Sequence, residues 1–210
     1  MNKLNLLIMV LLVLFGCGNK PNVEQLVSHS GVVEVKLGEQ WRSTGSAVGV
    51  EVDGQEYIIT AQHVAFPSQF TPVRVCSVVN RNNCVDVNPR DLIGPIYDQE
   101  PTGDWTYFPS DLPEGLKPAR IRPRRLGVGE SVWVVGCPIG ICGEVTTGIV
   151  TNYADELYHV DARAIPGNSG GPVFDDRGRV IGLLIAIRIT DQLGPVSDWG
   201  VVTPIYSNLR

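Results

Sequence analysis

The chain has 210 residues, of which 43% are hydrophobic, so it can bury the core of one or two compact domains. Its formal net charge is −5, from 22 acidic residues against 17 Lys and Arg, which excludes the basic footprint of a nucleic-acid-binding protein. The 23 glycines and 15 prolines, together with many β-branched residues, favour strands and turns over helices.

The first residues have the pattern of an export signal. Lys3 supplies a positive charge, and residues 6–15 (LLIMVLLVLF) form an uninterrupted apolar run. That run is too short to span a bilayer, which takes roughly 20 residues, but it fits the apolar region of a signal peptide. We therefore predict a signal peptide at residues 1–16.

Residues 14–17 (LFGC) resemble the lipobox of bacterial lipoproteins. The resemblance implies cleavage before Cys17, lipidation of Cys17, and a lipidated N-terminus with a tether over residues 17–30. Gly18 stands where an aspartate would retain such a lipoprotein in the inner membrane, which favours the periplasmic side of the outer membrane. The alternative is an ordinary secretory signal in which Cys17 is incidental.

Beyond residue 30, apolar and β-branched runs are separated by turn residues, which predicts many short strands. These runs occupy residues 31–37, 46–52, 56–61, 73–79, 104–108, 131–140, 144–153, 157–162, 171–175, 179–187 and 199–205. The DG pair at 53–54 predicts a tight hairpin, and DDRG at 175–178 predicts a further turn. Helical periodicity is almost absent, and only residues 206–210 have the pattern of a helix start. Because no helices alternate with the strands, we expect an all-β sandwich or barrel.

The number of cysteines is consistent with an exported protein, in which disulfides can form. Besides Cys17 the sequence contains Cys76, Cys84, Cys137 and Cys142, which allow three disulfide connectivities. Pairing each cysteine with its near neighbour is the simplest connectivity, and four free thiols are the alternative. The spacing is not that of a zinc site, so we predict no metal and no cofactor.

The stretch IPGNSGGPVF at 165–174 places one serine, Ser169, among three glycines. Glycine permits positive φ and close backbone approach, so this loop has the composition of one that presents backbone N–H groups to a reacting atom. A serine hydroxyl is a poor nucleophile unless a base lies within hydrogen-bonding reach and an acid orients that base. Among the three histidines, His63 lies at the end of a predicted strand, and Asp104 begins a predicted aromatic strand.

The segments TAQHV (60–64), GDWTYF (103–108) and PGNSGGPVF (166–174) resemble, in this order, the trypsin-like serine proteases of the HtrA/DegP-like bacterial branch. The similarity runs from about Gly31 to the C-terminus. It implies a chymotrypsin-like fold of two antiparallel six-stranded β-barrels, with a protease domain at residues 31–210. No segment corresponds to the PDZ domain common in that branch, so regulation through such a domain is not expected.

The resemblance also assigns roles to individual residues. Ser169 would be the nucleophile, His63 its general base, and Asp104 the residue that orients His63. The backbone N–H groups of Gly167 and Ser169 would form the oxyanion hole. Asn168 stands where many trypsin relatives have the aspartate that binds a newly cut N-terminus, so we expect activity without further propeptide cleavage.

The specificity pocket of this family is lined by residues just before the nucleophile loop, here Arg163, Ala164 and Ile165. Arg163 inside the pocket, with His159 as a second cation, would favour acidic residues before the cleaved bond. The alternative is that Arg163 points to solvent and the pocket is small and apolar.

The expected function is that of a serine endopeptidase with protein or peptide substrates, anchored by lipid in the bacterial cell envelope and acting on exported proteins. A catalytically silent, protease-like binding module and a structural envelope lipoprotein are the alternatives.

Overall fold

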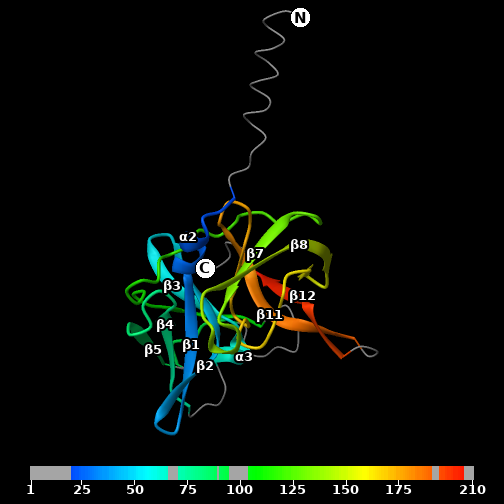
Figure 1. The fold of residues 1–210 in the computed structure, drawn as a ribbon. Coiled ribbons are helices and arrows are strands. Elements are labelled where there is room, and N and C mark those ends of the chain that lie inside the picture. The colour runs from blue at the N-terminus through cyan, green and yellow to red at the C-terminus, as the bar shows by residue number, and fades with distance from the viewer. Residues whose placement is uncertain (1–19, 66–70, 89, 95–103, 191–193, 206–210) are drawn as a thin grey trace, which may run out of the picture.

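A computed structural model describes residues 20–65, 71–88, 90–94, 104–190 and 194–205 (Figure 1). Within these residues the chain forms two antiparallel β units, one curled and one closed. The all-β prediction and the chymotrypsin-like fold are confirmed, but the first of the two predicted barrels is a six-stranded sheet that curls without closing among these residues. The signal peptide, the lipidation site at Cys17 and the helix start predicted at 206–210 lie outside the described residues.

The curled sheet has the order β5-β4-β1-β2-β3-β6. Its strands are β1 (Ser30–Leu37), β2 (Gln40–Val52), β3 (Gln55–Thr60), β4 (Val73–Ser77), β5 (Cys84–Val87) and β6 (Thr106–Pro109). The predicted hairpin at 53–54 joins β2 to β3, since Val52 pairs with Gln55 and both intervening residues have positive φ, 52° at Asp53 and 81° at Gly54. Two central residues with positive φ match the right-handed twist of the flanking strands.

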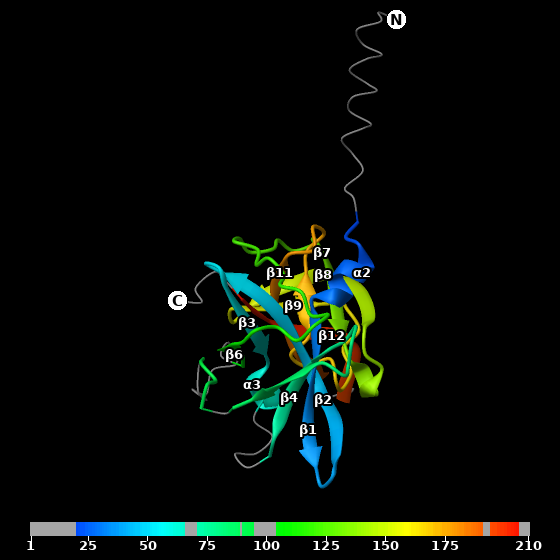
Figure 2. The ribbon, with the colours of Figure 1, turned by 90° about the vertical axis from the view of Figure 1, so that its left-hand side faces the viewer.

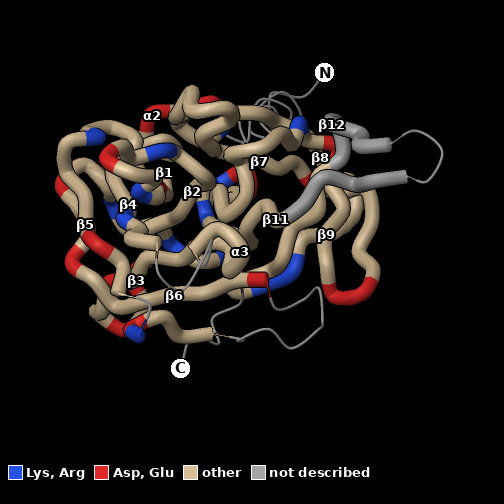
Figure 3. Tube along the Cα trace, turned by 90° about the horizontal axis from the view of Figure 1, so that it is seen from below, with Lys and Arg blue, Asp and Glu red and all other residues tan. Residues whose placement is uncertain are grey.

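The closed barrel has the order β10-β11-β12-β9-β8-β7. Its strands are β7 (Ser131–Gly136), β8 (Glu144–Ala154), β9 (Leu157–Val160), β10 (Pro172–Phe174), β11 (Val180–Thr190) and β12 (Gly194–Pro204). The connector that follows β6 contacts both units, because Ala119 bridges to Val50 of β2 and Ile121 bridges to Val180 of β11. Seen from below, the two units lie side by side with α3 (Gln62–Ala65) between them (Figure 3).

The main hydrophobic core is shared between the two units. Val33 and Ile58 of the sheet belong to the same buried cluster as Val135, Phe174 and Leu183 of the barrel, and all five are fully buried. Shared burial of this kind fixes how the two units face each other, so residues on their adjoining edges are held in a defined geometry.

Both disulfides join near neighbours. Cys76 is bonded to Cys84 across the β4–β5 pair, where the two residues face each other in register. Cys137 is bonded to Cys142 across the loop that contains the short helix η2 (Pro138–Gly140). The simplest of the three possible connectivities is therefore the one that the structure contains.

The helix α2 (Val23–Ser28) lies where the sequence predicted only a tether. The Asn22 side chain caps it by accepting hydrogen bonds from the N–H groups of Glu24 (2.9 Å) and Gln25 (3.4 Å). Leu26 is fully buried in the main core. The helix has fewer than two turns, too few for a repeating hydrophobic pattern, so periodicity could not reveal it. No helix among the described residues is long and apolar enough to cross a bilayer.

Truncating Leu26 tests whether this helix belongs to the folded domain. We expect Leu26→Ala to lower the free energy of unfolding by about 2–5 kcal/mol, because it leaves a cavity in the shared core. Urea unfolding measures the change, with Val23→Ala as the control because Val23 is 45% exposed on the same helix. Equal stability of the two variants would show that α2 does not stabilise the core.

The turn predicted at 175–178 is present, but its first residue is not a surface residue. Asp175 is fully buried and accepts hydrogen bonds from the backbone N–H groups of Arg177 and Arg179, both at 2.9 Å. Its other oxygen pairs with the guanidinium groups of Arg179 (2.8 Å) and Arg122 (3.3 Å). Burial by itself raises the pKa of Asp175, but the hydrogen bonds and charge of Arg179, with the N–H of Arg177, outweigh it and lower the pKa.

The lowered pKa of Asp175 predicts a pH dependence of stability. Ionised Asp175 stabilises the folded chain, and this contribution is complete above the pKa that an aspartate has in the unfolded chain, near 4. The contribution is lost as the pH falls through the lower pKa that Asp175 has in the folded chain. We expect Asp175→Asn to be less stable than wild type at pH 7 and to lose less stability on acidification to pH 3. Urea unfolding at both pH values measures this, with the exposed neighbour Asp176→Asn as the control. An equal acid-induced loss in wild type and Asp175→Asn would contradict the assignment.

Candidate active site

His63 lies in α3, directly beyond the end of β3. Its neighbours Gln62 and Val64 are buried, which fixes the backbone, while the His63 side chain is 41% exposed. The imidazole is therefore rigidly placed and still accessible from solvent.

Asp104 binds His63 at two points. Its Oδ2 lies 2.6 Å from His63 Nδ1, and its Oδ1 accepts a hydrogen bond from the His63 backbone N–H at 3.1 Å. Burial by itself raises the pKa of Asp104, but the hydrogen bonds and charge of His63, with a backbone hydrogen bond from Gln62, outweigh it and lower the pKa. An ionised carboxylate only accepts hydrogen bonds, so Nδ1 carries a proton, and in the neutral imidazole Nε2 is the nitrogen that keeps its lone pair.

The loop that carries Ser169 is folded by its own backbone hydrogen bonds. Asn168 N–H donates to Ile165 at 3.0 Å, and Gly171 N–H donates to Asn168 at 2.8 Å. Gly170 N–H donates to Leu184 of β11 at 2.7 Å, which attaches the loop to the barrel.

The same loop contacts the sheet beside α3. Ser46 N–H of β2 donates to the Ser169 carbonyl at 2.8 Å. A Cβ added to Gly45 would lie 2.4 Å from Val64 and 2.9 Å from the Ser169 carbonyl oxygen, so both residues pack against the same glycine. The fold thus brings the Ser169 loop next to the segment that holds His63, although 106 residues separate the two along the chain, counted as 169 − 63.

Two N–H groups in this loop have no hydrogen-bond acceptor within the described residues, those of Gly167 and Ser169. The N–H groups of Asn168, Gly170 and Gly171 all have acceptors. Gly167 has a φ of +100°, and an added Cβ would lie 2.3 Å from the Cys137 carbonyl oxygen, so a side chain there would collide with backbone. Both N–H groups are therefore available to donate hydrogen bonds to a substrate oxygen, as the donors of an oxyanion hole do.

Ser46 is a site residue that the sequence analysis missed. Its hydroxyl donates to the Gly167 carbonyl at 2.8 Å and accepts from the Cys137 N–H at 3.0 Å, which connects the Ser169 loop to the disulfide loop. Ile139 N–H adds a hydrogen bond to the Pro166 carbonyl at 3.0 Å. A serine within a strand pattern carries no signal of such a role, because the three segments meet only in the folded chain.

The residues predicted for the specificity pocket have different environments. Arg163 is on the surface, with its side chain 59% exposed and 3.9 Å from Glu144, whereas Ala164 is fully buried and Ile165 is half-buried. His159 lies on β9, opposite Val201 of β12. The position of Arg163 corresponds to the alternative in which the arginine points to solvent.

The fold and this loop geometry are those of a trypsin-like peptidase domain. Residues 45–183, well over half of the chain, match the family described as trypsin-like peptidase domain. The chain belongs to this family.

Relatives include the chloroplastic Protease Do-like 8 of Arabidopsis thaliana, which is 30% identical over 72% of this chain and 36% of its own length. A probable periplasmic serine endoprotease, DegP-like, of Brucella suis biovar 1 is 30% identical over 68% of this chain and 27% of its own length. The chain thus spans about a third or less of the length of these curated relatives. Among solved structures, the HtrA-type protease AlgW with tripeptide superposes with a TM-score of 0.64 at 25% identity, over 88% of this chain and 60% of the other.

Proposed function

We propose that this protein is a serine endopeptidase that uses His63, Asp104 and Ser169. The observation that carries the proposal is the hydrogen bond of 2.6 Å between Asp104 and His63 Nδ1, which leaves Nε2 as the base in a segment that packs beside the Ser169 loop. Family membership supports it, since the matching region 45–183 includes all three residues.

In this mechanism the Ser169 hydroxyl oxygen forms a bond to the carbonyl carbon of the substrate while His63 Nε2 accepts its proton. Asp104 stabilises the imidazolium that results. His63 then gives the proton to the leaving amine as the peptide bond breaks, and water hydrolyses the acyl-enzyme with His63 again as base. The N–H groups of Gly167 and Ser169 donate to the oxyanion of each tetrahedral intermediate.

We further propose that the peptidase acts outside the cytoplasm on exported or envelope proteins and is attached to a membrane through lipid on Cys17. The signal and lipobox patterns of residues 1–17 support this location, as does the similarity to a relative named as periplasmic. Two disulfides agree with an oxidising compartment.

A cleavage assay tests the proposed activity. The purified protein is incubated at pH 7.5 with a reduced, unfolded protein substrate, and the products are identified by mass spectrometry. We expect internal cleavages that diisopropyl fluorophosphate abolishes and a metal chelator leaves unchanged. A folded preparation that cleaves nothing, or cleavage that persists after the serine reagent, would contradict the proposal.

Gly167 offers a test of the oxyanion hole that leaves the three catalytic side chains in place. We expect Gly167→Ala to lower kcat/KM by roughly 10²–10³-fold, since the added methyl group must displace the loop and with it one N–H donor. Peptide hydrolysis measures the loss, and Gly38→Ala is the matched control, with positive φ but open space around the added Cβ. If Gly167→Ala were as active as Gly38→Ala, the N–H group of Gly167 could not be part of the oxyanion hole.

A further inference from the structure

A cavity lies between the β6–β7 connector and the β10–β11 turn. It has a volume of about 340 Å³, and four arginines and two carboxylates face it: Arg122, Arg124, Arg177, Arg179, Glu130 and Asp176. In Figures 1 and 2 the β10–β11 turn lies at the end of the molecule where the described chain begins, well away from α3. The cavity is therefore separate from the candidate active site.

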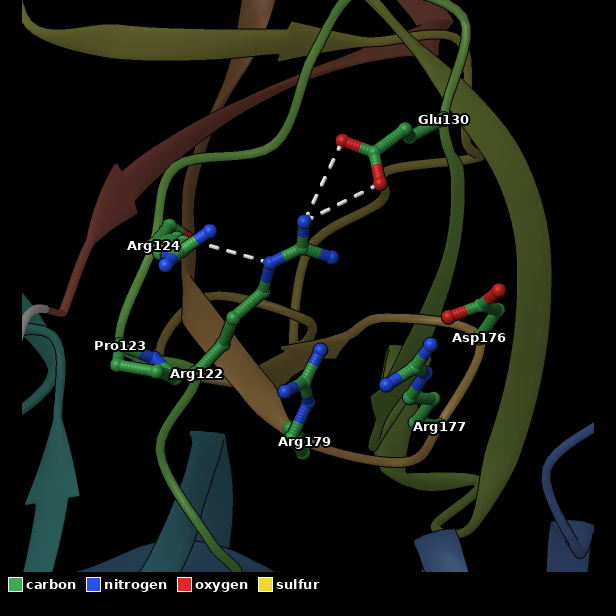
Figure 4. A pocket seen from close by; sticks show the side chains of 7 residues that line it. All are labelled: Arg122, Pro123, Arg124, Glu130, Asp176, Arg177 and Arg179. Carbon is green, nitrogen blue, oxygen red and sulfur yellow. Dashed lines mark hydrogen bonds and ion pairs between the residues drawn. The ribbon is translucent and has the colours of Figure 1, made fainter.

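Two of the arginines are held in fixed positions. Arg122 donates to the Arg124 carbonyl (3.0 Å) and to both oxygens of Glu130 (3.2 and 3.5 Å), as Figure 4 shows. It also donates to Asp175 (3.3 Å), and its side chain is only 14% exposed. Arg179 is bound to the buried Asp175 through its Nε at 2.8 Å. These contacts orient the guanidinium groups before any ligand arrives, which lowers the entropic cost of binding one.

Among the described residues, the other two arginines form no ion pair with a carboxylate. Arg124 and Arg177 are exposed, and no ion pair to either occurs in the part of the chain that the structure describes. Four cations face two carboxylates, and counting the buried Asp175 as a third still leaves an excess of one positive charge, 4 − 3. This positive cavity belongs to a chain whose net charge is −5, so it is a local feature and not a general surface property.

We propose that this cavity binds a phosphate group and that, in the anchored protein, the phosphate is that of an anionic phospholipid headgroup. The planar guanidinium group offers paired N–H donors that match two oxygens of one phosphate, so a site with two fixed and two unpaired arginines fits this ligand. The two non-bridging oxygens of a phosphodiester headgroup can accept hydrogen bonds from two guanidinium groups at once.

The position of the cavity favours the lipid as the source of the phosphate. A Cβ added to Gly178 of the β10–β11 turn would lie 3.4 Å from Leu26 and 3.8 Å from Pro21, so the turn packs against the start of the described chain. Cys17 precedes Pro21 by four residues, which span at most about 14 Å when extended. If Cys17 carries lipid, as the proposed function holds, this face lies close to the headgroups of the membrane.

Titration calorimetry of the purified full chain tests the site with two soluble probes, short-chain phosphatidylglycerol below its micellar concentration and inorganic phosphate. We expect saturable binding, and a dissociation constant at least about tenfold weaker in Arg124→Gln/Arg177→Gln. The control, Arg42→Gln/Arg90→Gln, removes the same charge outside the cavity and should change the constant less than about twofold. Urea unfolding confirms that each variant is folded.

Tighter binding of phosphatidylglycerol than of inorganic phosphate supports the lipid headgroup, and the reverse order supports a phosphate site that serves a soluble ligand. The proposal is overturned if wild type binds neither probe, or if the cavity variant and the control variant bind equally well. The assay requires neither hydrolysis nor the lipid anchor, so its result is independent of whether the peptidase proposal holds.

Discussion

Replacing Ser169 by alanine is expected to lower kcat by roughly 10⁵–10⁶-fold, the scale found when a serine peptidase loses its nucleophile. The loop that carries Ser169 is held by backbone hydrogen bonds to Ser46 of β2 and Leu184 of β11, and the serine hydroxyl takes no part in them. The substitution therefore removes the attacking oxygen while leaving the loop and its two available N–H groups in place.

The measurement is hydrolysis of a fluorogenic peptide found with the cleavage assay. Ser110→Ala is the matched control, because Ser110 lies in the chain that follows β6 and its hydroxyl donates to the neighbouring Asp111 carbonyl. We expect the control to retain full activity. If Ser169→Ala hydrolysed the peptide as fast as Ser110→Ala, another group would have to be the nucleophile.

Replacing Asp104 by asparagine is expected to lower kcat by roughly 10⁴-fold, with a much smaller change in KM. The side chain keeps its size, but an amide no longer stabilises a positive charge on His63 and no longer requires the proton on Nδ1. Because Asp104 also accepts a hydrogen bond from the His63 backbone at 3.1 Å, the geometry of α3 should survive the change.

The pH dependence gives this variant a second readout. The carboxylate of Asp104, whose pKa is lowered, is ionised above about pH 4, so the wild-type loss of kcat on acidification reports protonation of the base and not of Asp104. In Asp104→Asn we expect the acidic limb of the residual activity to shift to a lower pH than in wild type, since the imidazolium has lost its stabilising charge and protonates less readily. Asp111→Asn, an exposed carboxylate beyond β6, is the control. A variant with an unchanged kcat and pH profile would exclude Asp104 from the site.

The sequence predicted most of the fold because its strands carry local signals. The predicted runs overlap the observed strands, although β2 begins at Gln40 and β12 at Gly194, six and five residues before their predicted starts (46 − 40 and 199 − 194). The pair Asp53–Gly54 forms the predicted hairpin. Strand β5 was missed because its four residues, Cys84–Val87, are too few to show alternation. The helix α2 was missed for the same reason, although Asn22 followed by Gln25 resembles a helix N-terminus.

What the sequence could not predict depends on contacts between distant segments. Strand patterns do not encode whether a sheet closes on itself, so the open order of the β1–β6 sheet could not be predicted. Ser46 and the cavity arginines acquire their positions from partners up to 121 residues away along the chain, as in the Ser46–Gly167 hydrogen bond. Their positions in the strand pattern made His63 and Asp104 candidates, and the resemblance assigned them to one site.

Covalent labelling tests the central claim most directly. The folded protein is treated with a fluorophosphonate probe, digested, and examined by mass spectrometry for the modified peptide. We expect a single adduct, on Ser169, that forms far more slowly when His63 is replaced by alanine. A folded chain that acquires no adduct, or acquires it on a different serine at a rate that does not depend on His63, would contradict it.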